Sequence, residues 1–223
     1  MSDGIVLRRE LLLSENAERA AEFFRAAGIT VSSLEERAAS LAATLERVAA
    51  GDDVWVFGYG SLMWNPAFQH VELRTSRLRG WHRRFCVWNT FGRGSPEAPG
   101  LSLALETGGS CIGTAFRIAA REVQTELTVL WNREMLMGSY LARWVRLHTD
   151  DGPIDAVTFV ANRNNERYAG RLPLPRVAEV LARAHGPLGA ARDYLERTVA
   201  ELERQGARDG EMHALLRAVN TLT

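Results

Sequence analysis

Residues 54–66 read VWVFGYGSLMWNP, an apolar run that passes directly into a glycine-bearing turn. Short apolar runs that end at glycine are typical of buried strands. Gly58 and Gly60 flank Tyr59, which permits a tight turn and leaves backbone N–H groups open to a ligand. A plain strand-to-loop turn without a ligand is the alternative interpretation of this segment taken alone.

Further short segments with strand character follow, at residues 71–78, 81–88, 101–105, 111–118, 141–148 and 154–161. One helical segment, residues 120–135, interrupts them, so the chain lacks the βαβ alternation of a parallel sheet. We therefore expect an α+β fold, a small mixed or antiparallel β-barrel decorated by helices. Three closing helices are predicted, at residues 173–185, 190–205 and 209–222.

The first fifty residues differ in composition from the rest of the chain and are rich in Ala, Glu and Arg. Ser14 and Gly28 predict the start and end of one helix. Ser33 and Glu36 form a capping box that opens a second helix, toward residue 50. We expect residues 1–52 to be an N-terminal helical extension that packs through an amphipathic face, and residues 53–223 to form the main domain.

Composition excludes several classes of function. The 27 basic and 27 acidic residues cancel, so no basic excess indicates a nucleic-acid or anionic-membrane partner. All the basic residues are arginine, which excludes Schiff-base, pyridoxal-phosphate and P-loop lysines. The apolar run after Arg8-Arg9 is too short for a secretory signal, and no stretch approaches the ~18 apolar residues of a membrane span. Cys86 and Cys111 lack metal-site spacing, so we expect no metal and two buried thiols in the reducing cytoplasm.

Three familiar site motifs are weak here. The turn begins like a dinucleotide fingerprint, but Met63 stands where the third glycine belongs. Ser61 lacks the glycine that follows the serine of a nucleophile elbow. His82 and Cys86 share one face of a predicted strand but lie ~13 Å apart, too far for a nucleophile pair.

The helix predicted over residues 120–135 carries a carboxylate on its apolar face. Its apolar stripe comprises Val123, Leu127, Leu130 and Trp131, and its polar face Glu122, Glu126 and Arg133. Helical spacing places Glu134 on the apolar stripe. Burial raises the pKa of a carboxyl toward the range that a general acid or base needs. The alternative is a buried ion pair, with Arg84, Arg143 or Arg171 as partner.

A polar loop at residues 162–170 follows the last predicted strand and contains Tyr168. Its arginines and tyrosine are suited to bind a ligand carboxylate. A solvated connection is the alternative, because most polar loops have no ligand.

Six segments occur in order along the chain: VFGYGSLMWNP (56–66), GWHRRFC (80–86), RGSPE (93–97), REM with a following G-x-Y (133–140), YAG with a following PL (168–174), and GPLG leading to DYL (186–195). Together they resemble the ChaC-type γ-glutamylcyclotransferases. Asn89 departs from this resemblance, since many bacterial members have serine there.

The resemblance implies a small β-barrel decorated by helices, and cleavage of glutathione to 5-oxoproline and cysteinylglycine without a metal or organic cofactor. It implies that residues 59–62 cradle the γ-glutamyl group and that Glu134 is the general acid/base. The expected substrate-binding residues are Tyr59, Gly60, Ser61, Leu62, Tyr140 and Tyr168. Ring closure is intramolecular, so proximity supplies much of the acceleration and no nucleophilic side chain is needed.

Two other functions stay open at this point. One is the same reaction on other γ-glutamyl amino acids or amines. The other is a non-catalytic small-molecule-binding regulatory module, against which Glu134 argues, because a binding module has no need for a buried carboxylate. The sequence does not set the oligomeric state, and a monomer is compatible with it.

Overall fold

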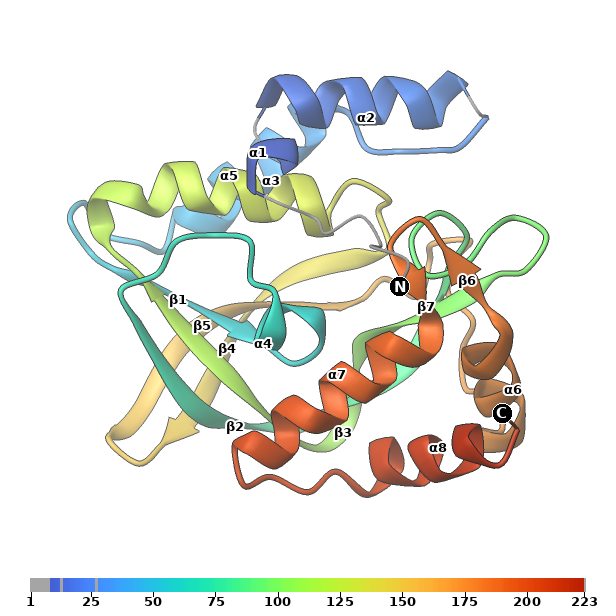
Figure 1. Ribbon diagram of the computed structural model, residues 1–223. Helices are drawn as coiled ribbons and strands as arrows, with labels where there is room; N and C mark the ends of the chain where they lie inside the picture. Colours follow the sequence, from blue (N-terminus) through green and yellow to red (C-terminus); the bar gives the residue numbers. More distant parts are fainter. Residues whose placement is uncertain (1–8, 13, 27, 223) are drawn as a thin grey trace.

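The chain forms a closed β-barrel with helices packed on its outside (Figure 1). The computed structural model describes residues 9–12, 14–26 and 28–222, so Arg8 lies outside the described residues. The barrel strands are β1 (Val54–Gly58), β2 (Glu72–Asn89), β3 (Gly100–Ile118), β4 (Tyr140–Thr149) and β5 (Gly152–Ala161). Their order is β1-β3-β2-β4-β5, and β5 closes the barrel by pairing in parallel with β1. The predicted α+β class and mixed barrel are confirmed.

Strands β2 and β3 are longer than expected, because each joins two predicted strands. β2 continues through Gly80, where φ is 81° and the register shifts between Arg79 and Trp81. β3 continues through Gly108 and Gly109, whose φ values are 102° and 70°. Glycines with positive φ bend a strand without ending it, so these two long strands curve around the barrel.

In the described part of the chain, apolar side chains form two large buried clusters and a small third one of Cys86, Val87, Ala104 and Ala161. The first fills the space between the barrel and the three predicted closing helices, which are α6 (Leu174–Arg183), α7 (Ala191–Arg204) and α8 (Gly210–Asn220). The second lies under α5 (Val123–Glu134), which follows the short turn η1 (Ala120–Glu122). Phe159 of β5 meets Trp131 of α5 edge-to-face at 5.3 Å in this second cluster. Packing on the barrel therefore fixes the helix that carries Glu134.

Arg83 is a fully buried cation that links three parts of the fold. It donates hydrogen bonds to the carbonyl oxygens of Tyr59, at 2.5 Å, and Ile112, and its Nε lies 3.0 Å from Oδ2 of Asp209. The other carboxylate oxygen of Asp209 accepts from the first backbone N–H groups of α8. The turn after β1, strand β3 and the start of α8 thus share one charged centre.

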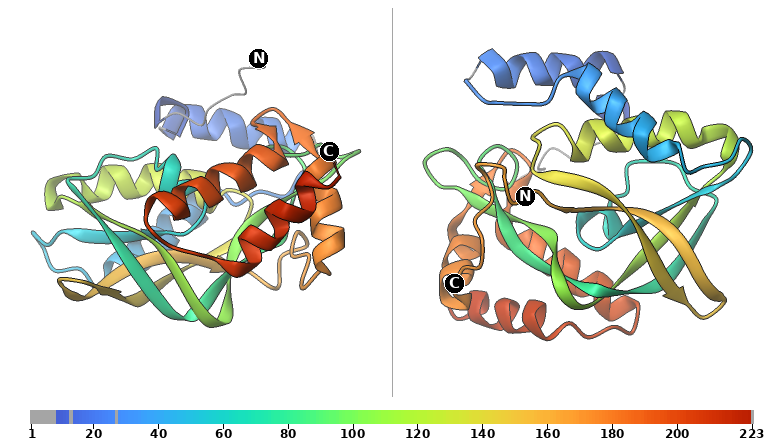
Figure 2. Two further views of the ribbon diagram at one scale, coloured as in Figure 1. Left: turned by 60° about the horizontal axis from the view of Figure 1, so that its bottom comes forward. Right: turned by 180° about the vertical axis from the view of Figure 1, so that it is seen from behind.

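The N-terminal extension packs on α5 (Figure 2). Its helices are α1 (Arg9–Leu12), α2 (Ser14–Ala26) and α3 (Leu34–Leu45). The capping box of Ser33 and Glu36 is confirmed, although α3 ends at Leu45 rather than near residue 50. None of the helices in the described part of the chain is long and apolar enough to cross a membrane.

The prediction that Glu122, Glu126 and Arg133 form the polar face of α5 is partly wrong. Glu126 is completely buried, and its carboxylate accepts from the guanidinium of Arg9 and from the backbone N–H of Gln69. The side chain of Arg133 is 5% exposed. The extension and the segment after α4 (Ser61–Trp64) cover this face, so polar residues there bind partners instead of water.

Candidate active site

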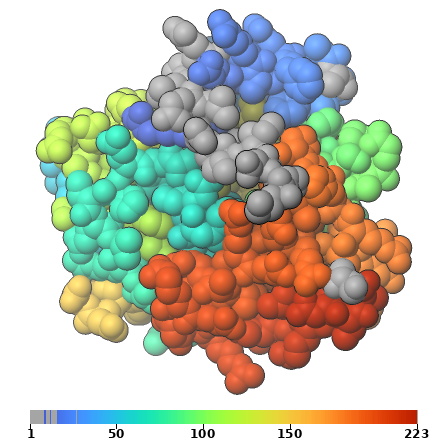
Figure 3. Space-filling view, in the orientation of Figure 1, coloured from blue at the N-terminus to red at the C-terminus, as the bar shows by residue number. Residues whose placement is uncertain are grey.

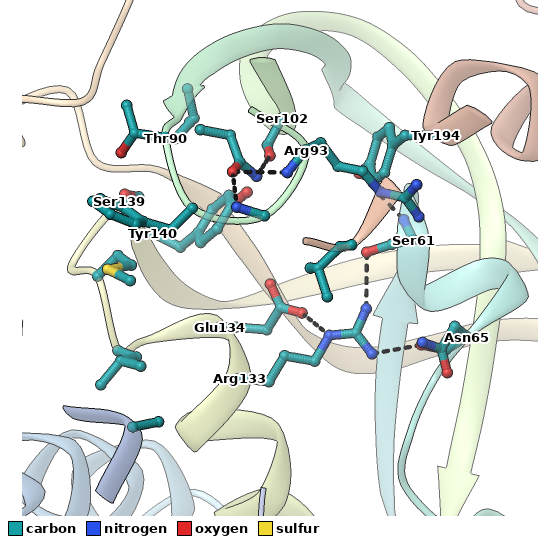
Figure 4. A pocket seen from close by; sticks show the side chains of 18 of the residues that line it. Ser61, Asn65, Thr90, Arg93, Ser102, Arg133, Glu134, Ser139, Tyr140 and Tyr194 are labelled. Atoms are coloured by element: carbon teal, nitrogen blue, oxygen red, sulfur yellow. Dashed lines mark hydrogen bonds and ion pairs between the residues drawn. The ribbon is translucent and has the colours of Figure 1, made fainter. Parts of the chain in front are cut away.

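A cavity of about 580 Å³ opens where the end of α5 meets the turn after β1, the loop after β2 and the extension (Figure 4). Its lining combines apolar side chains with convergent polar ones, as ligand sites usually do. Ser61, Asn89, Arg133, Glu134, Tyr140 and Tyr194 are among the polar residues that line it.

Glu134 is the last residue of α5, and its carboxylate faces the cavity. Oε1 lies 3.0 Å from Nε of Arg133, and the other oxygen points into the space between Tyr140 and Ser61 (Figure 4). Burial raises the pKa of Glu134, and the Arg133 guanidinium offsets only part of that effect. The negative end of the α5 dipole acts in the same direction as burial. A carboxyl with a raised pKa and one oxygen in a cavity is suited to accept and return a proton.

Arg133 joins this carboxylate to the turn after β1. Its guanidinium donates to Ser61 Oγ at 2.9 Å and to the carbonyl oxygen of Asn65 at 2.5 Å. The partner of Glu134 is therefore the adjacent arginine, and not Arg84, Arg143 or Arg171. The structure brings the two motifs of the sequence, the turn and Glu134, together through this one side chain.

The four residues of the turn differ in their relation to the cavity, and Tyr59, Gly60 and Leu62 lie outside its lining. Ser61 lines it. Tyr59 is buried, and its hydroxyl donates to the carbonyl oxygen of Phe159 at 2.7 Å. Gly60 has no room for a side chain, because a Cβ atom would lie 2.7 Å from the Tyr194 hydroxyl. Leu62 packs in the apolar cluster under α5 and lies outside the lining.

The two other tyrosines that were expected to bind the substrate, Tyr140 and Tyr168, differ in position. Tyr140 lines the cavity, and its hydroxyl donates to the carbonyl oxygen of Leu103 at 3.0 Å. Tyr168 pairs with Val87 through the backbone and lies outside the lining. The loop of residues 162–170 nevertheless reaches the cavity through Arg167, which donates to Thr90 Oγ1 at 3.1 Å.

Sequence reasoning assigned no role to Tyr194 or Asn89, although both line the cavity. The Tyr194 hydroxyl accepts from the backbone N–H of Ser61 at 3.3 Å. The Asn89 side chain accepts from the N–H groups of Gly92 and Arg93 and donates to Ser102 Oγ. Both residues lie in or beside quoted segments, but nothing in a single sequence gives the direction of their side chains.

Arginines surround the aromatic ring of Trp64 at one end of the cavity. The guanidinium of Arg93 lies 5.9 Å from the ring centroid and that of Arg197 lies 5.3 Å from it. Arg93 also donates to the carbonyl oxygen of Ala190 at 3.2 Å. Cations at this distance from an indole ring are stabilised by its quadrupole. Oδ2 of Asp193, which also lines the cavity, lies 4.0 Å from Nη1 of Arg93, so one carboxylate balances part of this positive charge.

The cysteines do not take part in this arrangement. Both thiols are free and buried, as expected. Burial raises the pKa of Cys86 to about 12 and that of Cys111 in the same direction, so both stay protonated and unreactive. Among residues 9–12, 14–26 and 28–222, no three His, Cys, Asp or Glu side chains gather closely enough to hold a metal ion.

A family model described as "ChaC-like protein" matches residues 54–222. This chain belongs to the ChaC-like family. One member, named "Glutathione-specific gamma-glutamylcyclotransferase" and found in Escherichia coli (strain K12), is 44% identical over 191 residues, which cover 85% of this chain and 83% of that protein. A human member named "Glutathione-specific gamma-glutamylcyclotransferase 1" is 32% identical over 176 residues, which cover 76% and 79%.

A similar fold is seen in a solved yeast structure, described as a γ-glutamyl cyclotransferase specific to glutathione. It matches with a TM-score of 0.71 at 22% identity, over 76% of this chain and 96% of that one. This likeness supports the barrel and its surrounding helices. The ChaC-like match begins at residue 54, after the N-terminal extension.

Proposed function

We propose that this protein is a glutathione-specific γ-glutamylcyclotransferase, which converts glutathione to 5-oxoproline and cysteinylglycine. The observation that carries this proposal is Glu134, held at one oxygen by Arg133 and facing a cavity beside the turn of residues 59–62. The names of relatives that are 44% and 32% identical support glutathione as the substrate.

In the proposed reaction, the substrate's α-amine attacks its own γ-carbonyl carbon. Glu134 accepts a proton from the α-ammonium, so that the nitrogen lone pair forms the new C–N bond and the carbonyl oxygen becomes an oxyanion. As the intermediate collapses, the C–N bond to cysteinylglycine breaks and its nitrogen takes the first proton back from Glu134. The new ring nitrogen gives up its second proton through the same carboxylate to the freed amine, so that 5-oxoproline is left as a neutral lactam and cysteinylglycine departs as an ammonium. No water is consumed, and every atom of glutathione appears in one of the two products. Proximity within one molecule supplies much of the acceleration.

The other residues receive roles from their positions. We assign Ser61 and the backbone of residues 59–62 to the γ-glutamyl group and its developing oxyanion. Arg133 is a positioning residue, because it acts on Glu134 and Ser61. Tyr140 bounds the cavity. Tyr59, Leu62 and Tyr168, which lie outside the lining, are proposed to hold the turn and the adjoining loop in place.

We also propose a domain boundary and a setting for the reaction. Residues 53–223 form the catalytic domain and residues 1–52 its extension, which the family match over residues 54–222 supports. The free, buried thiols of Cys86 and Cys111 suit a reducing compartment, so the cytoplasm is the proposed location. The balanced charge gives no basic excess for a nucleic-acid partner, which suits an enzyme that acts on a small molecule.

Release of 5-oxoproline from glutathione, run beside γ-Glu-Ala, tests the proposal. We expect release from glutathione, and a loss of about a thousandfold in kcat for Glu134→Gln, within the range usual for a general acid or base. Glu179→Gln, on the exposed side of α6, is the matched control and is expected to behave as the unmodified protein.

Other outcomes have definite meanings. Release mainly from γ-Glu-Ala would keep the mechanism and change the substrate to other γ-glutamyl compounds. No release from either substrate by folded protein would overturn the catalytic proposal and leave a binding module.

A further inference from the structure

Helix α2 of the extension forms one wall of the cavity that holds Glu134. Asn16, Ala17, Ala20 and Phe24 line it, next to Leu12 of α1. Their spacing of three and four residues places them on one face of the helix. We call these five residues the α2 wall. The wall precedes the ChaC-like match at residue 54, so it is an addition to the part of the chain that the family model describes.

The α2 wall is anchored on both sides of the cavity. On the α5 side, Asn132 donates to the carbonyl oxygen of Leu12 at 3.0 Å and accepts from the buried guanidinium of Arg37 at 3.1 Å. On the other side, the ring of Phe24 meets that of Phe91, in the loop after β2, edge-to-face at 5.5 Å. In the space-filling view the extension rests against this loop (Figure 3). The helix therefore bridges the cavity from α5 to the loop.

Ser139 is a buried polar residue of the same cavity. It lines the cavity, it is 4% exposed, and its hydroxyl has no hydrogen-bond partner within the described part of the chain. A buried polar group left unpaired is costly, so a ligand group that pairs with this hydroxyl gains a hydrogen bond at little further desolvation cost. Ser139 and Thr90 lie on the opposite side of Glu134 from Ser61 and Tyr194 (Figure 4).

We propose that the α2 wall and Ser139 form the subsite for the leaving group, and that α2 thereby selects which γ-glutamyl compounds are accepted. The inference rests on the proposed function, which places the γ-glutamyl group at residues 59–62. With Glu134 between the two ends, the cysteinylglycine part extends toward Ser139. Its peptide group can pair with the hydroxyl, and the small side chains of Ala17 and Ala20 leave room for the cysteine. A bulkier leaving group would meet the helix.

Three variants test the subsite by steady-state kinetics with glutathione and γ-Glu-Ala, which lacks the thiol and the glycine. Phe24→Ala is expected to raise the KM for glutathione about tenfold with little change in kcat, since loss of apolar complementarity removes ground-state binding. Ala20→Trp is expected to lower kcat/KM for glutathione more than for γ-Glu-Ala. Leu34→Ala is the matched control, because Leu34 is an apolar side chain of the extension that is 44% exposed and lies outside the lining.

Ser139→Ala separates a role in substrate binding from a role in stability, because the two roles predict different changes in KM and melting temperature. The variant removes an unpaired hydroxyl, so the melting temperature of the free protein is expected to stay the same or rise. The KM for glutathione is expected to rise about fivefold, because the substrate loses a hydrogen bond.

Titration calorimetry in the Glu134→Gln background measures the affinity of the protein for glutathione without turnover. Weaker binding when Phe24→Ala or Ser139→Ala is added supports the subsite. Unchanged binding with both, or equal effects on glutathione and γ-Glu-Ala, overturns it. Absence of 5-oxoproline from the unmodified protein would instead overturn the proposed function, and the binding comparison would still decide the subsite.

Discussion

At the scale of single residues, Glu134 is under two opposed influences. Burial raises the pKa of its carboxyl and the Arg133 guanidinium lowers it, with a net rise above the ordinary value of 4.5. In the proposed reaction Glu134 acts first as a base, so it must be ionised in the free enzyme. The rate is therefore expected to fall as the pH drops through the raised pKa, so the acid limb of the kcat/KM profile lies above pH 4.5.

Arg133→Met is expected to move that acid limb to higher pH. The substitution removes the positive charge that lowers the pKa of Glu134 and leaves burial in place. Profiles of kcat/KM from acid to neutral pH measure the shift. Arg121→Met, at an arginine whose side chain is 80% exposed, is the control for loss of one positive charge. An acid limb that stays in place in Arg133→Met would show that Glu134 is not the titrating base.

Tyr59→Phe is expected to affect stability more than substrate affinity. The lost hydroxyl donates to a buried carbonyl oxygen, and a bond of that kind contributes about 1 kcal/mol. Denaturant unfolding measures the change, while the KM for glutathione is expected to stay within about twofold. A stable variant with a much higher KM would instead place the Tyr59 hydroxyl in contact with the substrate.

At the scale of elements, α5 depends on the extension that covers it. Asn132 is 2% exposed and pairs with both α1 and the buried Arg37 of α3. Asn132→Ala leaves these groups partly unsatisfied, so we expect a loss of about 2–3 kcal/mol in the free energy of unfolding. Gln124→Ala, on the exposed face of the same helix, is the control. A loss no larger than in the control would show that the extension contributes little to α5.

Helical periodicity is enough to place Glu134 on the apolar face of α5. It is not enough to place the neighbouring polar side chains. The stripe of apolar residues fixes the direction of one face of α5, and Glu134 lies at the end of that face. Glu126 and Arg133 were expected in solvent because their partners are distant in sequence: Arg9 is 117 residues from Glu126, and Asn65 is 68 residues from Arg133. Local pattern carries no information about such contacts.

In the barrel, too, local sequence predicts the position of an element but not its tertiary contacts. Strand positions followed from apolar runs, but glycines between them could end a strand or bend it. In β2 and β3 they bend it, because the neighbouring strands continue the hydrogen-bond ladder past Gly80 and Gly108. The cavity-lining directions of Tyr194 and Asn89 are likewise set by packing between elements, which one sequence does not display.

At the scale of the whole molecule, the pair of Arg83 and Asp209 links the closing helices to the turn after β1. Arg83 is 1% exposed in its side chain and Asp209 is 24% exposed. Asp209→Ala removes both the ion pair and the cap of α8, so we expect a loss of about 3 kcal/mol in the free energy of unfolding. Asp209→Asn keeps the capping oxygen and is expected to lose about 2 kcal/mol.

Chemical denaturation of both variants checks this prediction. Glu196→Ala, which breaks an exposed pair with Arg192 on α7, is the control and is expected to cost less than about 0.5 kcal/mol. Equal losses in Asp209→Asn and the control would mean that Arg83 is satisfied without its carboxylate.

The contacts between the extension and α5 also set an order of assembly. Arg37 binds a residue 95 positions later in the chain, and Arg9 one that is 117 positions later. A ribosome adds roughly 5–20 residues per second, so the extension is made roughly 5–20 s before the surface on which it packs. During translation its apolar stripe faces solvent or a chaperone. The extension can therefore dock only once α5 has left the ribosome.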